Sequence, residues 1–384
     1  MASIYSANSA SSQWIFPISA LDHTPTALER SSEEEMYDRA RGIEFLFRLG
    51  TSIGLHSPGI FTAATWFHRF FMRYSMEDYH RQNVAASCIF LTTKTEECGR
   101  KLRDVARVFV SKVSATDIKE ISENGNEVEE AANAILSTEE ALLEALCFDF
   151  VVDSPHAYLV DLFNAQESNY TLEDYAWSIA HDSFRTPLCV LYPPRITAVA
   201  CYVLAQRIAD GPHSHSLDAR ISPSAPSASL PTPPSQKPAS PDGTRFAIEF
   251  FGLNEPELYS VAGNIVVKCL WQRKFGTLNS ILKDALSIII EFYHFQASQG
   301  LSDYLGDILS VPPPTTSPPR RPLYKTFPDP NGTSSIPHAG NDLRSDADTG
   351  HGRTPDSVHG NSTPTKTHVN GSVSNSTSKR LDLS

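Results

Sequence analysis

Apolar residues recur every three or four positions from Glu33 onward, which is the spacing of one face of an α-helix. Ile43, Leu46, Phe47 and Gly50 form one such stripe. Similar stripes and their start signals predict five helices before position 150, over residues 33–50, 57–71, 84–91, 101–113 and 127–148. The first part of the chain is therefore expected to be a helical bundle.

Two segments are apolar or small on every side, which is typical of a helix enclosed by other helices. They are Val84–Leu91 and Ile196–Ile208, each the third in its group of predicted helices. When the first segment is laid on the second at an offset of 113 residues, Lys94 falls on Arg207. The identical pairs are Ala85 with Ala198, Cys88 with Cys201 and Leu91 with Leu204. An internal duplication therefore predicts two similar helical groups.

The second group begins where Ser154 and Pro155 offer an N-cap and a first-turn proline. Residues 171–185 suit its next helix, and the enclosed helix follows. Further along the chain, apolar stripes over 258–269 and 278–295 predict two more helices.

Prolines mark the segments between and after these elements. Of 27 prolines, eight lie within 212–243 and eight within 312–330. Segments rich in Pro and Ser bury too little apolar surface to offset the loss of chain entropy on folding. We therefore predict an all-α protein with a disordered insertion at 212–243 and a disordered tail at 301–384.

Charge and motifs narrow the function. Residues 1–211 hold 29 acidic against 17 basic side chains, whereas the rest of the chain holds 15 of each. An acidic folded part disfavours binding to the nucleic-acid backbone. The absence of a basic leader and of a long apolar run predicts a soluble intracellular protein. No phosphate-binding loop, zinc-protease, serine-hydrolase or kinase motif is present, so neither a cofactor nor a metal is expected.

The cysteines lack the spacing of zinc ligands and mostly lie in apolar surroundings, so we interpret them as reduced thiols in the core. They are Cys88, Cys98, Cys147, Cys189, Cys201 and Cys269.

One carboxylate breaks the apolar pattern. In the fifth predicted helix Glu139 lies in the middle of the stripe formed by Ile135, Leu142 and Leu146. A buried carboxylate needs a partner. That partner could be an internal cation such as Arg39 or Lys94, or this face could meet another protein.

At these positions the sequence resembles the cyclins. Leu91–Glu97 (LTTKTEE) is similar to the LAxKxEE motif of the family, and Leu146–Phe150 (LCFDF) resembles its LxFxL motif. Glu139 stands where the family has a Glu nine residues before the Phe at 148, and Arg39 matches a buried arginine of the first helix. Two five-helix cyclin-box repeats make up the cyclin fold, in agreement with the duplication.

The resemblance is to the transcriptional cyclins T, K and L. His68–Met72 (HRFFM), followed by Ser75, resembles their HRFYM motif. Where cell-cycle cyclins have an apolar docking patch, this chain has Asp38, Arg41 and Gly42. Further similar segments are Gln13–Phe16 with Thr24–Pro25, Glu96–Glu97 with Arg100–Leu102, and Val152–His156.

The resemblance implies a first cyclin box over 13–152, a second over 153–275 interrupted by the insertion, and an additional helix at 276–300. It implies a nuclear regulatory subunit, not an enzyme, that binds and activates a cyclin-dependent kinase. The expected substrate of that kinase is the C-terminal domain of RNA polymerase II, in transcription elongation or mRNA processing, and a third subunit could join the heterodimer.

The resemblance also implies roles for individual residues. The residues implied to bind the kinase are Lys94, Glu139, Leu143, Phe148 and Phe150, and those implied to be structural are Arg39 and His68. For Phe148 a place in the core, closing the first repeat, is an equal alternative.

Two other functions remain open: a splicing-associated cyclin of the L type, and a nucleic-acid-binding factor with the same fold, similar to transcription factor IIB. The acidic first part argues against the second, and we expect neither direct DNA binding nor membrane association. Six residues precede proline within predicted disorder and could be phosphorylated by the bound kinase: Ser222, Thr232, Ser240, Ser317, Thr354 and Thr363.

Overall fold

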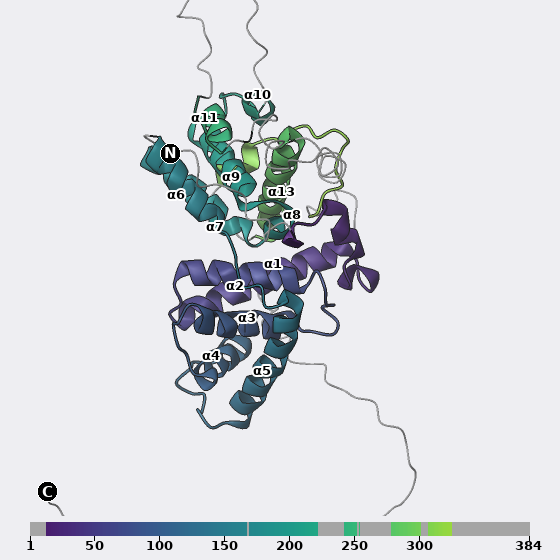
Figure 1. Ribbon diagram of the computed structural model, residues 1–384, viewed down its shortest axis with the longest axis vertical. Coiled ribbons are helices and arrows are strands. Elements are labelled where there is room, and N and C mark those ends of the chain that lie inside the picture. Colours follow the sequence, from purple (N-terminus) through teal and green to yellow (C-terminus); the bar gives the residue numbers. More distant parts are fainter. Residues whose placement is uncertain are drawn as a thin grey trace, which may run out of the picture. The chain divides into compact units, whose positions relative to one another are not determined.

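The computed structural model describes residues 13–166, 169–221, 242–251, 253, 278–300 and 306–324. Within these ranges the chain forms α-helices and short 3-10 helices and no strand, as Figure 1 shows. The all-α prediction is confirmed. Among the described residues, no helix is both long and apolar enough to span a membrane.

The first group of helices has the five predicted members. They are α1 (Ser32–Ser52), α2 (Ser57–Phe70), α3 (Arg81–Thr95), α4 (Leu102–Ser114) and α5 (Asn126–Leu146). The predicted enclosed helix, α3, contacts all four of the others, and their side chains form one hydrophobic cluster. The enclosure of α3 explains why its sequence shows no polar face.

Local signals fix the start and the packing of α1. Ser31 and Glu34 form a capping box at its first turn. Gly42 lies against the ring of Phe67, where an added Cβ would come within 2.3 Å of the ring. Because an added Cβ would clash with this ring, Gly42 allows α1 and α2 to approach closely.

The second group is built around α9 (Pro194–Ala209), which contacts helices before and after it in the chain. Ser154 caps α6 as predicted, accepting a hydrogen bond from the backbone N–H of His156. The other helices of this group are α6 (Pro155–Ala165), α7 (Tyr170–Ser183), α8 (Leu188–Leu191), α10 (Leu217–Ile221), α11 (Asp242–Phe250) and α13 (Leu278–Ser298). The short helix α8 was not predicted, and the stripe at 258–269 lies outside the described residues.

The equivalence of α3 and α9 is visible in their buried side chains. Each of the three residue pairs that align at the 113-residue offset is buried in the core of its own group. They are Ala85 with Ala198, Cys88 with Cys201, and Leu91 with Leu204.

Two predicted boundaries are wrong. The insertion was expected from residue 212 to 243, but α10 buries Leu217 and Ile221, and α11 begins at Asp242. The tail was expected from residue 301, but Gly306–Ser310 forms the 3-10 helix η5, and the chain stays packed to Tyr324. A few apolar side chains in a proline-rich sequence are enough to hold these segments on a neighbouring helix.

The cysteine prediction is confirmed for Cys88 and Cys201, which are free and buried. Burial raises the pKa of both thiols well above its ordinary value. Cys147 is exposed, so its expected place in the core is wrong. It caps the C-terminus of α5 in the left-handed region, with φ of 50°.

Candidate functional site

The carboxylate that breaks the apolar pattern of α5 is paired with the cation at the end of α3. Lys94 Nζ donates to both oxygens of Glu139, at 2.8 and 2.7 Å. The Glu139 side chain is 5% exposed and that of Lys94 is 48% exposed. Of the two internal partners considered for Glu139, Lys94 is the one found, and the pair lies where it can reach solvent.

Apolar groups lie beside this pair. Lys94 Nζ is 4.2 Å from the centroid of the buried Phe90 ring, within cation–π range. On α5, Leu136, Glu139 and Leu143 share one face because they are three and seven positions apart. Leu136 is half exposed and Leu143 partly buried. The charged pair therefore has apolar side chains beside it.

The chain leaves α5 through a tight turn that exposes an aromatic ring. Cys147 and Phe148 are both left-handed, with φ of 50° and 58°. Phe148 is 66% exposed and Val151 is 70% exposed. Phe150 is partly buried against Trp66, with ring centroids 5.8 Å apart. The alternative that Phe148 closes the core is wrong.

These groups follow one another along the end of the first bundle. Leu143 lies one turn after Glu139, its carbonyl accepts from the N–H of Phe148 at 3.2 Å, and the ring of Phe148 lies 6.3 Å from that of Phe150. We call this set the α3–α5 surface; it consists of Lys94, Leu136, Glu139, Leu143, Phe148, Phe150 and Val151. Leu136 and Val151 were not predicted, although the position of Leu136 three residues before Glu139 placed it on the same face.

Arg39 and His68 lie in the interior. Both are fully buried, and Arg39 pairs with Glu35 at 2.6 Å and donates to the carbonyl of Phe71 at 2.8 Å. His68 Nδ1 faces Arg39 Nη1 at 3.3 Å, and its Nε2 faces the carbonyl of Phe184 at 2.9 Å. Because Arg39 can only donate and the carbonyl can only accept, His68 is neutral with its proton on Nε2. Burial, with the charge of Arg39, lowers the pKa of His68 to about 3.

Asp38 and Gly42 of α1 are two of the three residues that stand where the sequence was expected to lack an apolar docking patch. Asp38 pairs with Arg30 and with Arg81, each at 3.1 Å. Gly42 contributes no side chain to the surface. This part of α1 is therefore occupied by an ion-pair network.

The basic run before and along α4 serves the chain itself. Arg100 donates to the carbonyl of Ile53 at 2.9 Å. Arg107 donates to the carbonyls of Ile118 and Ile121, each at 2.9 Å. The bond from Arg100 holds the end of α1, and the bonds from Arg107 hold the connection from α4 to α5, so both guanidinium groups bind the chain itself.

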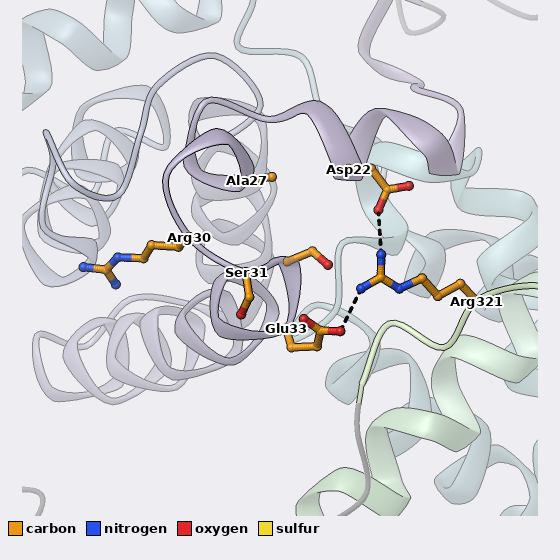
Figure 2. Close-up of a pocket in the computed structure, with 7 residues that line it drawn as sticks. Asp22, Ala27, Arg30, Ser31, Glu33 and Arg321 are labelled. Carbon is orange, nitrogen blue, oxygen red and sulfur yellow. Dashed lines mark hydrogen bonds and ion pairs between the residues drawn. The ribbon is translucent and has the colours of Figure 1, made fainter.

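A polar hollow of about 240 Å³ lies at the first turn of α1, and Figure 2 shows the residues that line it. Arg321 reaches between Asp22 and Glu33, at 3.8 and 2.8 Å. Arg30 is already engaged by Asp38. The charged groups of this hollow pair with protein side chains, and within the described ranges no cluster of side chains is suited to a metal ion.

Of the predicted phosphorylation sites, Ser317 lies within the structure and is exposed. The other five lie outside the described residues: Ser222, Thr232, Ser240, Thr354 and Thr363.

Comparison with known proteins identifies the first bundle. Residues 20–151 match the family described as cyclin, N-terminal domain. The chain is 39% identical over 199 residues to cyclin pch1 of Schizosaccharomyces pombe, covering 50% of this chain and 57% of pch1. It is 30% identical over 199 residues to cyclin-K of Danio rerio, covering 51% and 45%. The matched region thus spans about half the length of these relatives.

A solved structure of the yeast RNA polymerase II C-terminal-domain kinase complex CTDK-1 contains a similar chain. The likeness covers 64% of this chain and 72% of that one, with a TM-score of 0.42 and 18% identity. A likeness this distant carries no argument about function.

Proposed function

Residues 20–151 are a cyclin N-terminal domain, homologous to cyclins pch1, K and T, and we propose that the chain is the regulatory subunit of a cyclin-dependent kinase. It binds the kinase through the α3–α5 surface and has no catalytic activity of its own. The observation that carries this proposal is the Lys94–Glu139 pair, in which the carboxylate is buried and the ammonium half exposed, on the helix that leads to the solvent-facing ring of Phe148.

The pair is suited to bind a polypeptide backbone. An ammonium group has three donors, and Lys94 directs at most two of them to Glu139. A third donor can reach a backbone carbonyl of the partner, while the carboxylate of Glu139 can accept a backbone N–H. In the complex the apolar side chains beside the pair would be buried together with it, and the loss of water strengthens both bonds.

Activation follows from selective binding. A kinase of this group is active only when its αC helix brings a Glu to the Lys that holds the ATP phosphates. A rigid surface that binds this state more tightly than the inactive one shifts the equilibrium by the difference in affinity. The interlocked α1–α5 bundle, with α3 enclosed, supplies such a rigid surface.

The test replaces Lys94→Ala and Glu139→Ala together and measures the Kd for a purified cyclin-dependent kinase. Losing a desolvated charged contact costs roughly 2–5 kcal/mol, so we expect at least about 30-fold weaker binding. Helical content stays unchanged because both partners of the internal pair are removed.

Two further variants make the test specific. The exchange Lys94→Glu with Glu139→Lys preserves an internal ion pair but inverts what the surface presents, and it too must lose the kinase. The matched control, Glu123→Ala, removes the Arg107–Glu123 ion pair outside the α3–α5 surface but keeps the bonds of Arg107 to the backbone, and it must bind normally. Normal binding by the folded double-alanine variant would refute the site.

The substrate of the kinase, its location in the cell and the domains of the chain are part of the same proposal. The kinase acts on the C-terminal domain of RNA polymerase II in the nucleus, and the chain comprises two cyclin boxes, 13–152 and 153–275. Affinity purification that identifies the co-eluting kinase tests this assignment and would reveal a third subunit.

The alternative functions have their own tests. Recovery of splicing factors would favour the splicing-associated cyclin of the L type. Salt-sensitive binding to duplex DNA in a gel shift would favour the factor similar to transcription factor IIB. Turnover of ATP without a kinase subunit would contradict the regulatory role.

The bound kinase is also proposed to phosphorylate the chain itself at its six Ser/Thr-Pro sites. Ser317 is exposed between anchored neighbours, since Thr315 N donates to Asp218 at 3.0 Å and Arg320 pairs with Glu291. Mass spectrometry of the reconstituted pair incubated with ATP tests all six sites.

A further inference from the structure

We infer that Trp14 is a positioning residue for the α3–α5 surface: it holds the turn after α5 in the conformation that presents Phe148 to the partner. This inference rests on the proposed function. It concerns an N-terminal segment that supplies no atom to the surface and acts through Asp149.

The turn needs to be held because it is strained. Cys147 and Phe148 are consecutive residues in the left-handed region, a conformation that is unfavourable for residues with a Cβ. The ring of Phe148 is mostly in solvent, so its own packing cannot stabilise this backbone. Residues in such conformations persist only when neighbouring groups fix them.

Asp149 is the residue that neighbouring groups fix. Its carboxylate accepts from Trp14 Nε1 at 2.8 Å, from Gln13 Nε2 at 2.6 Å and from the N–H of Val151 at 3.3 Å. Burial alone would raise the pKa of Asp149, but these donors and the charge of Arg69 lower it below its ordinary value. The carboxylate is thus charged and held from three directions.

Two arginines of the first bundle join Trp14 to the same turn. Arg69 lies over the indole, 4.7 Å from its centroid, and donates to the carbonyls of Asp149 and Val151 at 3.4 and 3.2 Å. Arg73 lies 5.1 Å from the indole and donates to Cys147 Sγ at 3.1 Å. Trp14 therefore bonds Asp149 directly, and the two arginines that stack on its indole bond Cys147, Asp149 and Val151, the residues on either side of Phe148.

The N-terminal segment is itself anchored on its other side. The N–H of Phe16, two residues after Trp14, donates to the carbonyl of Val190 in α8 at 2.8 Å. Trp14 is 2% exposed. The indole can act as a fixed support because its own backbone is tied to a different part of the fold.

The test is a double-mutant cycle on kinase affinity with Trp14→Phe and Phe148→Ala. The Phe variant keeps an aromatic ring for the arginines but removes the N–H that Asp149 accepts. We expect each single change to weaken binding roughly 10-fold or more, and the double variant to bind no more weakly than Phe148→Ala alone. If Trp14 were only a core residue, its substitution would lower the melting temperature and its effect on binding would be absent or multiply with that of Phe148→Ala; either result overturns the inference.

A second variant keeps the test open if Trp14→Phe does not fold. Asp149→Asn preserves the size of the side chain but removes its charge and one acceptor oxygen, and the same cycle with Phe148→Ala must again be non-additive. Trp177→Phe, which changes a partly exposed tryptophan of α7, serves as the matched control and must leave affinity unchanged.

The outcome also separates this inference from the proposed function. Normal binding by Phe148→Ala, together with loss of binding in the Lys94 and Glu139 variant, would refute the positioning role and leave the proposed function intact. Normal binding by all of these variants would refute both.

Discussion

The helices α3 and α9 are equivalent in the core of their bundles but end differently. At the aligned position, the side chain of Lys94 pairs with Glu139 of α5 and is half exposed. Arg207 at the end of α9 is buried and donates to the carbonyls of Gly211 and Pro212 in the loop that follows it. Lys94 is therefore open to solvent, whereas Arg207 binds the loop that follows its own helix.

The difference indicates that the two bundles have different roles, although their central helices are equivalent. In the first bundle the polar end of the central helix lies beside exposed apolar groups, which is the arrangement of a binding surface. In the second bundle the corresponding cation, Arg207, makes internal bonds, and α13 is covered by the segment 306–324. We therefore expect changes in the second bundle to alter stability and changes at the α3–α5 surface to alter binding.

The largest expected effect is the loss of the segment 306–324. Ile308, Val311 and Tyr324 are buried in it, and burying each side chain is worth about 1.5–3 kcal/mol. Truncation after Gly300 should therefore lower the free energy of unfolding by about 4 kcal/mol or more, and the melting temperature by roughly 10 °C. Thermal unfolding followed by circular dichroism measures this.

The control for this truncation is a chain cut after Tyr324, which keeps the whole segment and should be more stable than the shorter one. Kinase affinity of the shorter chain, measured below its melting temperature, should stay within a few fold of the full chain. A large loss of affinity without a loss of stability would break the comparison between the two bundles.

The sequence predicted the parts of the fold that depend on periodicity. All five helices of the first bundle and the cap at Ser154 follow from spacing and start signals. The need to pair a buried charge predicted a partner for Glu139 but left Arg39, Lys94 and another protein as alternatives, and the structure shows Lys94. The exposed turn after α5 was not predicted, because the motif around Phe148 specifies a residue type but not the left-handed backbone that turns the ring outward.

Other features could not be predicted because they join residues that are distant in the sequence. Trp14 and Asp149 are 135 residues apart, and no periodicity relates them. The segment 306–324 has the composition of a tail, yet its ion pair from Arg320 to Glu291 and the ring of Tyr324 depend on the position of α13. Composition describes the average of a segment and misses a few well-placed anchors.

The second expected effect is smaller and compares the two aligned cations directly. Arg207→Ala leaves two backbone carbonyls without their donor and should cost about 2 kcal/mol of stability, with kinase affinity unchanged within about twofold. The double-alanine variant at Lys94 and Glu139 should do the reverse. Chemical denaturation and kinase titration of both proteins give the two values, and equal losses of affinity would show that the ends of α3 and α9 are not functionally distinct.

The smallest expected effect near neutral pH concerns the junction where His68 bonds to the carbonyl of Phe184. His68 has a pKa of about 3 in the folded protein and about 6.5 when unfolded. Between these values the unfolded chain binds a proton that the folded chain does not, so stability falls as the pH drops below about 6.5. The loss is about 1.4 kcal/mol per pH unit and continues toward pH 3. The pKa of His156, lowered to about 4 by burial and by the neighbouring His181, adds a second contribution of the same sign.

The variant His68→Gln isolates the first contribution. Gln can still accept from Arg39 or donate to a carbonyl but does not titrate, so its unfolding free energy should vary less steeply between pH 6.5 and 4 than that of the parent. His156→Gln should remove only the second, smaller part of the slope. Because neither histidine bonds to Lys94 or Glu139, kinase affinity at pH 7 should be unchanged in either variant. A parent protein whose stability does not depend on pH in this range would show that His68 is not held neutral in the folded state.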